Sequence, residues 1–595
     1  MALPFLEKHI TQEAVMKLLI HYRCKEAEKV QKVNVVEELA VQPDEGEVNE
    51  EEKTNERREE LYGLFPPRRQ WVHIGFESRK NLSQLDKNEL NLWYTVVRES
   101  QKTGVHPEWY ERLTARAEKI VTAALTSERL FSRPMVGVIE KKRSEKDKTI
   151  ECRLICLFKT LDERIYASLY NKVFTRLFDS LMYENSFAFR VPHKGDPQML
   201  HLKAVRKIKE FRRAHEGHLW VAECDMKKFY DTLDHDVIKK RFCQMLRWKK
   251  QEGAINIVEA RILKNVIFSY VNCFSFYKDV FRYNKKPRHP IWRSIRNSGG
   301  YSKKIKWIEA DIEKRRAAGT WPYRTKKHDR YELGVPQGGA LSGVIANVVM
   351  HFTDIKLRRY WQESDDFLYI RFCDDMIMMG VDKSKVEEAF ERYGQTIEAN
   401  NLYMHPPLEF TGKKMKAFWD GKTRPPYRWG KPEKDVMPWV TFVGYDVNWE
   451  GDTRIRQSSL KKEIKKQYEK LIEVVHLLGG KKGRNPQWTR QYIYNSVLKR
   501  MVGMSVGRVQ IWDYEHFDNY YSWAKAMTEL TDNKWSRWQL RQLDKHRNLM
   551  MRRLGRFISE LNYDEIKPSE DRERNDALWF YGKPFSYYGQ VLKKW

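Results

Sequence analysis

Two adjacent carboxylates interrupt an apolar stretch in the second half of the chain. Residues 367–371 and 376–380 are rich in apolar and aromatic side chains of the kind that favours strands. Residues 372–375 lie between them and end in Asp374 and Asp375, so the pattern predicts a strand, a tight turn and a second strand. Neighbouring carboxylates in apolar surroundings repel each other unless a cation lies between them, and a hard divalent ion meets that need. A solvated Asp-Asp turn is the alternative interpretation.

A third predicted strand, residues 219–225, ends in Asp225. An acid at the carboxyl end of a strand is well placed to hold a metal. Beside Asp374 and Asp375 it would complete a site for two divalent ions. Two such ions activate an attacking hydroxyl and stabilise the leaving oxygen of a phosphoryl transfer.

Two further strands are predicted at residues 135–139 and 152–158, on either side of a basic turn at 141–148. Lys141 and Lys142 belong to this turn. The basic charges of this turn are suitable for binding phosphates, and they are equally typical of an ordinary exposed turn.

Helical periodicity dominates both ends of the chain, and a strand pair is predicted within residues 439–449. Asp162 is a candidate N-cap, and Ser458 or Ser459 caps a further helix that Gly479 and Gly480 end. The domain boundaries follow from these patterns. We expect a helical N-terminal extension (1–130), a mixed central region (131–455), the start of another helical domain (456–480) and a helical C-terminal region (481–595).

The net charge of the chain indicates what kind of partner it binds. The chain carries 110 Lys and Arg against 81 Asp and Glu, a net charge of +29, with 13% aromatic residues. Such an excess suits a polyanion, most simply a nucleic acid. Residues 278–330 hold 17 basic and 5 acidic residues with interleaved aromatics. They fit either single-stranded nucleic acid or a solubilising insertion.

Residues 334–343 form a glycine-rich loop that leads into a predicted helix, which lets backbone amides approach a substrate closely. The loop lacks the spacing of a P-loop. The seven cysteines form no Cys-x-x-Cys pair, and we find neither a signal peptide nor an apolar run of membrane length. These features predict free thiols in a cytoplasmic protein with no membrane partner.

The order of these motifs resembles a reverse transcriptase of the bacterial branch, which includes group II intron, retron and defence-associated enzymes. The resemblance covers residues 134–460. It is carried by five ordered stretches: Arg153 with Asp162 and Arg164, residues 187–190, Asp225 to Asp231, residues 334–347, and 372–375. The family's fold is implied, namely an α+β right-hand polymerase with fingers, a palm with an antiparallel sheet and a thumb, here with helical N- and C-terminal extensions.

The resemblance also implies roles. Asp225, Asp374 and Asp375 would be the catalytic residues and would bind two Mg²⁺ ions. Tyr230 would be the steric gate that favours dNTPs over rNTPs, and Gln337 would line the nucleotide pocket. The triphosphate would be held by Arg153 and, with less support, by Lys141 or Lys142.

Departures from the family pattern point to one subgroup. Cys373 and Gly343 replace the usual alanine and proline, and no Cys/His endonuclease module follows the predicted thumb. The large terminal regions are most similar to stand-alone bacterial reverse transcriptases linked to phage defence.

The resemblance therefore implies an RNA-directed DNA polymerase that acts in antiphage defence. An RNA template, such as a dedicated noncoding RNA, a DNA product and dNTPs would be its partners, and a protein partner or homo-oligomer stays open. Alternatives are a maturase-like RNA-binding protein and an untemplated or protein-primed nucleotide polymerase.

Overall fold

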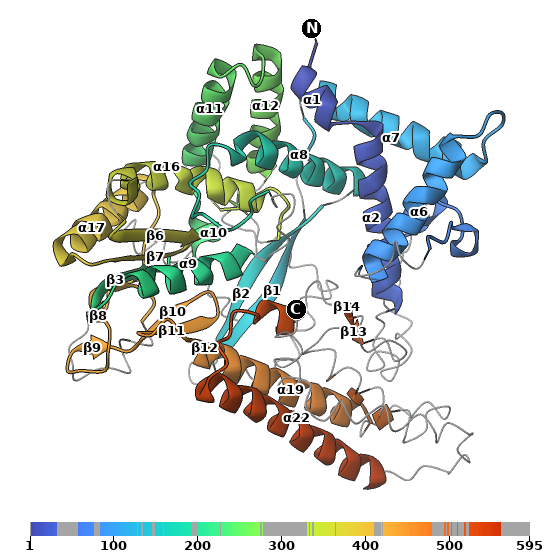
Figure 1. The fold of residues 1–595 in the computed structure, drawn as a ribbon. Coiled ribbons are helices and arrows are strands. Elements are labelled where there is room, and N and C mark those ends of the chain that lie inside the picture. Colours follow the sequence, from blue (N-terminus) through green and yellow to red (C-terminus); the bar gives the residue numbers. More distant parts are fainter. Residues whose placement is uncertain are drawn as a thin grey trace. The chain divides into compact units, whose positions relative to one another are not determined.

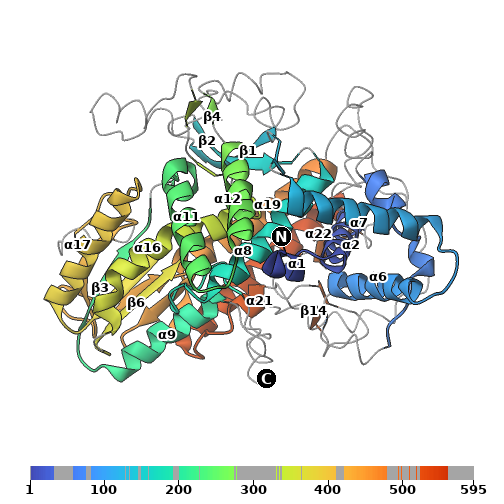
Figure 2. The ribbon, with the colours of Figure 1, turned by 90° about the horizontal axis from the view of Figure 1, so that it is seen from above.

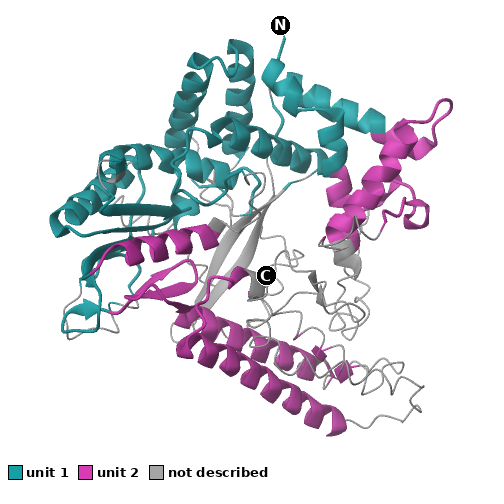
Figure 3. Ribbon diagram, in the orientation of Figure 1, with its two compact units in different colours: residues 1–18, 114–197, 217–437 teal, residues 19–113, 198–216, 438–595 magenta. Residues whose placement is uncertain are grey.

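The computed structural model describes part of the chain and divides it into two compact units (Figure 3). The described residues are 2–31, 58–75, 82, 84–127, 129–132, 135–144, 149–158, 160–191, 200–226, 228–273, 276–277, 330–331, 334–335, 338–362, 365–409, 418, 421–478, 493–494, 497–498, 501, 508–509, 517–518 and 523–560. Unit 1 comprises Met1–Leu18, Thr114–Pro197 and Gly217–Met437, and unit 2 comprises Leu19–Leu113, Gln198–Glu216 and Pro438–Trp595. Two of the borders, at 18/19 and 113/114, fall within helices α2 (Gln12–Gln31) and α7 (Glu108–Thr126).

Unit 1 is built on a five-stranded sheet with the order β6-β7-β3-β8-β9 (Figure 1). Its strands are β3 (Leu219–Cys224), β6 (Phe367–Phe372), β7 (Asp375–Gly380), β8 (Arg424–Trp429) and β9 (Val436–Met437). Neighbours are antiparallel except for β8 and β9. The strands are almost wholly buried because helices cover them. Helix α17 packs on β3, β7 and β8, and α16 packs on β6 and on α17.

Strand β8 was not predicted, because it carries Pro425 and Pro426 and proline cannot donate a ladder hydrogen bond. The structure accommodates both prolines at an irregularity in the pairing with β3. Val221 pairs with Tyr427 and Glu223 pairs with Arg424, so the register shifts across the two prolines. The described residues 402–409 form no strand.

The helices of unit 1 form the rest of its core. Phe174, Phe178 and Phe242 pack together between α8 and α11, and α11 lies beside α12 (Figures 1 and 2). Thr160, and not Asp162 as predicted, caps α8 in a capping box with Glu163. The helices are α1 (Pro4–His9), α8 (Leu161–Asp179), α10 (Phe229–Thr232), α11 (His235–Gln251), α12 (Ile257–Cys273), α16 (Ser342–Gln362) and α17 (Lys383–Ala399).

Two small antiparallel pairs complete unit 1. Strands β1 (Met135–Ser144) and β2 (Thr149–Leu157) form the hairpin predicted from the sequence, and β4 (Phe276–Tyr277) pairs with β5 (Arg330–Tyr331).

Unit 2 joins a three-stranded sheet to two long helices. The hairpin of β10 (Trp439–Phe442) and β11 (Tyr445–Asn448) confirms the predicted strand pair, and Gly444 takes a φ of +93° in its turn. The side chain of Gln539 makes two 2.8 Å hydrogen bonds, to the amide and the carbonyl of Ile455. The other elements are η1 (Arg68–Gln70), α6 (Gln84–Ser100), α9 (Leu200–Ala214), β12 (Thr453–Ile455), α19 (Gln457–Leu478), β13 (Arg508–Val509), β14 (Phe517–Asp518), α21 (Trp523–Ala526) and α22 (Lys534–Glu560).

Sequence and structure differ on the faces of the two long helices. Helix α19 begins at Gln457, so neither Ser458 nor Ser459 is its cap. Tyr468 of α19 and Trp538 of α22 are 44% and 54% exposed, although both stand at helical spacing from the apolar residues of their helices. The mixture of helices with antiparallel sheets is confirmed, while the predicted domain boundaries stay predictions.

Candidate active site

The Asp-Asp turn closes the hairpin of β6 and β7, as the sequence predicts. Phe372 pairs with Asp375, which leaves Cys373 and Asp374 as a two-residue turn. Such short turns need a residue with positive φ, usually glycine, and here Cys373 takes it with a φ of +60°. The surroundings must therefore hold Cys373 in an unfavourable conformation.

Asp225 lies at the matching end of the neighbouring strand. Cys224 of β3 pairs with Met376 of β7, so one further step in the same register brings Asp225 beside Asp375. Residues opposite each other in an antiparallel pair have Cβ atoms about 4.5–5.5 Å apart. The fold thus brings the three predicted carboxylates together from positions 150 residues apart in the sequence.

The electrostatics agree with this proximity. Burial and the negative charge of Asp225 raise the pKa of Asp374 above its ordinary value. Burial, together with the charges of Asp225, Asp375 and Asp374, raises the pKa of the Cys224 thiol to about 12. The end of the hairpin is a site of concentrated negative charge, which favours a bound cation.

Lys422 supplies a cation at this place. Its ammonium nitrogen lies 2.7 Å from Oδ2 of Asp225 and 3.2 Å from Nε2 of His405. The carbonyl of Asp225 accepts hydrogen bonds from the amide of His405 at 3.0 Å and from the hydroxyl of Thr423 at 3.3 Å. The carboxylate of Asp225 thus already holds a cation, the ammonium of Lys422, through an oxygen atom.

In the part of the chain that the structure describes, no three His, Cys, Asp or Glu side chains are arranged to enclose a metal ion. The ion pair with Lys422 gives a physical reason, since the carboxylate of Asp225 faces the ammonium. Metal binding by Asp225, Asp374 and Asp375 accordingly stays a prediction, and it requires Lys422 to leave the carboxylate.

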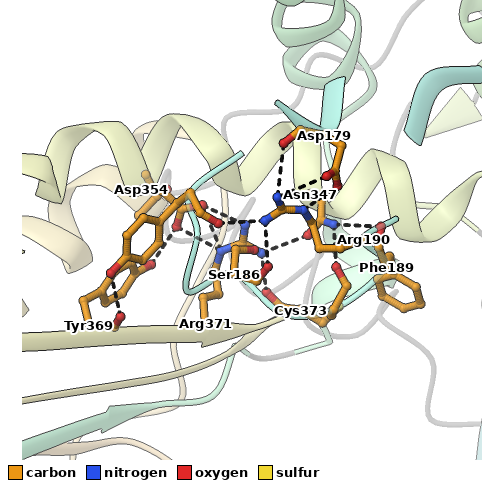
Figure 4. Close-up of polar contacts among 12 residues, drawn as sticks. Asp179, Ser186, Phe189, Arg190, Asn347, Asp354, Tyr369, Arg371 and Cys373 are labelled. Carbon is orange, nitrogen blue, oxygen red and sulfur yellow. Dashed lines mark hydrogen bonds and ion pairs between the residues drawn. The ribbon is translucent and has the colours of Figure 1, made fainter. Parts of the chain in front are cut away.

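The buried side chain of Arg371 holds the Asp-Asp turn from the interior of the protein (Figure 4). Its guanidinium, 0% exposed, donates to both carboxylate oxygens of Asp354, at 2.9 and 2.7 Å. It also donates to the carbonyl of Cys373 at 3.0 Å and to Oδ1 of Asn347 at 3.2 Å. Burial lowers the pKa of Arg371, but the charge of Asp354 outweighs that and raises it above its ordinary value. The permanently charged Arg371 therefore fixes the strained carbonyl of Cys373 from inside the protein.

Tyr230 contacts the turn. Its hydroxyl lies 3.0 Å from Sγ of Cys373. Burial raises the pKa of both groups, that of Cys373 to about 12, so both stay neutral at pH 7. The carbonyl of Tyr230 accepts from the amide of Val335 at 2.8 Å, which joins it to the start of the glycine-rich loop.

The other predicted nucleotide-binding residues are only partly visible. Arg153 and Lys142 lie in β2 and β1, and Lys141 falls at the register shift of that hairpin, but their side chains lie outside the described structure. Gln337 and residues 278–329 of the basic insertion also lie outside the described residues. Their proposed contacts stay predictions.

Three residues of the site were missed at the sequence level. Arg371 and Asp354 are charged residues inside otherwise apolar stretches, and that pattern is a usable signal for a buried ion pair. Lys422 carries no such signal. In the resemblance to reverse transcriptases, Lys413 or Lys414 would be the lysine of the motif that follows the Asp-Asp turn and its helix. Both residues lie outside the described part of the chain.

Comparison with known proteins adds little to the geometry. No protein-family model and no curated protein matches the chain. Among solved structures, apo telomerase from Candida tropicalis is 12% identical with a TM-score of 0.33, over 86% of this chain and 75% of that one. Telomerase from Candida albicans with a TWJ fragment of telomeric RNA is 12% identical with a TM-score of 0.30, over 86% and 76%. Scores this low do not establish a shared fold.

Proposed function

We propose that the chain is an RNA-directed DNA polymerase that joins dNTPs by two-metal phosphoryl transfer. The observation that carries the proposal is the meeting of Asp225 with Asp374 and Asp375 at the ends of adjacent strands, beside Tyr230. The sheet of unit 1 would be the palm of a right-hand polymerase. The order of motifs in the sequence, which resembles reverse transcriptases, agrees with this assignment.

Each residue has a distinct role in the proposal. Asp225, Asp374 and Asp375 would hold two Mg²⁺ ions, whose chemistry is to activate the primer hydroxyl and to neutralise charge on the triphosphate. Arg371 positions the turn through the carbonyl of Cys373. Tyr230, fixed against Cys373, would exclude a ribose 2′-hydroxyl by its bulk.

The long helices of unit 2 offer a surface for nucleic acid. Exposed cations line α19 and α22, and phosphates favour such rows because binding releases counterions. These side chains are Lys461, Lys462, Lys465, Lys466, Arg541, Lys545, Arg552, Arg553 and Arg556. In the proposal α19 belongs to the thumb.

Primer extension tests the proposal directly. Purified full-length protein with Mg²⁺, dNTPs and a primed RNA template should make DNA. Asp374→Asn keeps the size of the side chain and removes its charge, so synthesis should fall more than about a hundredfold.

Asp365→Asn is the matched control, because Asp365 is an exposed acid in the turn that precedes the same hairpin. It should leave synthesis unchanged. DNA synthesis that survives Asp374→Asn would refute the assignment. RNA binding without synthesis by the wild-type protein would favour the maturase-like alternative.

A role in bacterial antiphage defence, with an associated noncoding RNA, is the finer part of the proposal. Its support is the sequence resemblance to stand-alone bacterial reverse transcriptases. Sequencing the RNA and DNA that copurify with the protein identifies template and product. Product without a complementary RNA would favour untemplated or protein-primed synthesis instead.

A further inference from the structure

Phe189 is a bulky residue with an unfavourable backbone conformation and an exposed side chain. Its φ is +54°, in the left-handed region that side chains other than glycine rarely adopt. Its side chain is also 50% exposed, although the residues on both sides of it are better buried. A strained backbone combined with an exposed aromatic ring is stable only if the surroundings enforce both.

The surroundings do enforce the conformation (Figure 4). Asn347 donates from Nδ2 to the carbonyl of Ala188 at 2.7 Å. On the other side Arg190 donates to Oδ1 of Asp179 at 2.6 Å and to the carbonyl of Tyr183 at 2.8 Å. The backbone is thus tied down immediately before and immediately after Phe189.

One side of the ring is packed against Gly343, at the start of α16. A Cβ at position 343 would lie 2.6 Å from Cδ1 and Cγ of Phe189, a distance that real contacts do not reach. Glycine at position 343 therefore lets the ring rest directly on the helix backbone. The rest of the ring remains open to solvent.

The ring is coupled to the catalytic turn through two side chains. Asn347, which bonds to the Phe189 loop, also accepts from Arg371, and Arg371 donates to the carbonyl of Cys373. All these links are buried. Figure 4 shows the ring of Phe189 projecting away from this polar cluster. The fold thus presents a flat apolar surface in a fixed relation to Asp374.

We infer that the open face of Phe189 is a stacking platform for a nucleobase next to the polymerase site. Aromatic side chains held rigid with one face free are how proteins bind unpaired bases without reading their sequence. The inference rests on the proposed function and deepens it. The base belongs either to the template or to the incoming nucleotide, which share the same chemistry.

Fluorescence of 2-aminopurine tests this without any chemistry, because stacking quenches it. One arm places 2-aminopurine at the templating base of a primed RNA, and the other uses 2-aminopurine deoxynucleoside triphosphate as the probe. Wild-type protein and Phe189→Trp should quench one of the two probes. Phe189→Leu keeps apolar bulk without the aromatic face, and it should abolish the quenching and weaken binding of that probe roughly tenfold.

Phe189→Gly separates stacking from folding. It relieves the positive φ, so its melting temperature should not fall, yet it should lose the quenching as completely as Phe189→Leu. Tyr94→Ala is the matched control, since Tyr94 is a 47% exposed aromatic residue of α6 and belongs to unit 2, whereas the Asp-Asp turn belongs to unit 1. It should quench like the wild type.

Three results would overturn the inference. They are the absence of quenching by the wild-type protein in both arms, quenching that persists in Phe189→Gly, and quenching by Phe189→Leu equal to that by Phe189→Trp. The last result would mean that the site takes any apolar group, as a protein-docking surface would. Failure of the polymerase proposal is separate, because it shows as absent DNA synthesis whatever the probes report.

Discussion

Arg371 and Lys422 each bond to an aspartate near the Asp-Asp turn, but the first pair is sealed in the interior while the second faces solvent. The side chains of Arg371 and Asp354 are 0% and 1% exposed, whereas those of Lys422 and Asp225 are 55% and 24% exposed. A buried pair cannot exchange its partners for water without a large cost, while an exposed pair contributes little and can be replaced.

The difference separates two tasks within one site. The buried pair builds the turn, since Arg371 also holds the carbonyl of Cys373. The exposed pair balances the charge of Asp225 with a group that water or another cation can replace. A site that binds and releases ions needs both a rigid frame and an exchangeable counter-charge.

The largest expected effect comes from breaking the buried pair. Arg371→Met leaves the carboxylate of Asp354 buried without its partner, which should lower the free energy of unfolding by about 3–5 kcal/mol. Denaturant titration measures this. A loss below about 1 kcal/mol would mean that the interior around Asp354 admits water, and the contrast with Lys422 would disappear.

A smaller change in the free energy of unfolding is expected from protonation of His351, which would place a second positive charge near Arg371 in the interior. Burial and the nearby positive charge of Arg371 lower the pKa of His351 from 6.5 to about 4, although the charge of Asp354 opposes them. In the unfolded chain His351 therefore binds a proton near pH 6.5, whereas in the folded protein it stays neutral at that pH. Stability is complete above that pH and should fall by on the order of 2 kcal/mol between pH 7.5 and 5.

Unfolding of wild type and His351→Gln at both pH values isolates this contribution. The variant has no imidazole to protonate, so the difference between the two proteins should shrink as the pH falls. An equal pH dependence in both would show that His351 accepts its proton in the folded state.

The smallest effect on stability is expected from the exposed pair. Lys422→Met should change the free energy of unfolding by less than about 1 kcal/mol. The same variant should bind Mn²⁺, a probe for Mg²⁺, several-fold more tightly, because the ammonium no longer competes for Asp225. Calorimetric titration of the protein without nucleotide measures this, and unchanged or weaker binding would contradict an exchangeable counter-charge.

The local patterns were predictable to the extent that neighbours in the sequence decide them. The hairpin around Asp374, strand β3 and the hairpin of β1 and β2 were all expected, because the alternation of apolar residues acts over a few positions. Strand β8 was not, since its two prolines suit a strand only where the partner strand is irregular. The cap of α8 was misplaced by two residues although its signal is local, since Thr160 and Glu163 form the capping box only three positions apart.

The candidate site divides in the same way. The carboxylates and Tyr230 could be proposed from motif order, but their counter-charges could not. Nothing near Lys422 in the sequence indicates that it lies against Asp225, which is 197 positions away. Long-range ion pairs depend on which strands become neighbours, and that is a property of the whole sheet.

By itself, the sequence determined the elements and the chemistry available to them: strands ending in acids, a basic chain and a glycine-rich loop. Only the tertiary structure decided which charges are sealed and which are exposed. The free energy of a charge depends on its distance from water and from other charges. Those distances exist only once Asp225, Arg371 and Lys422 are brought together by the sheet.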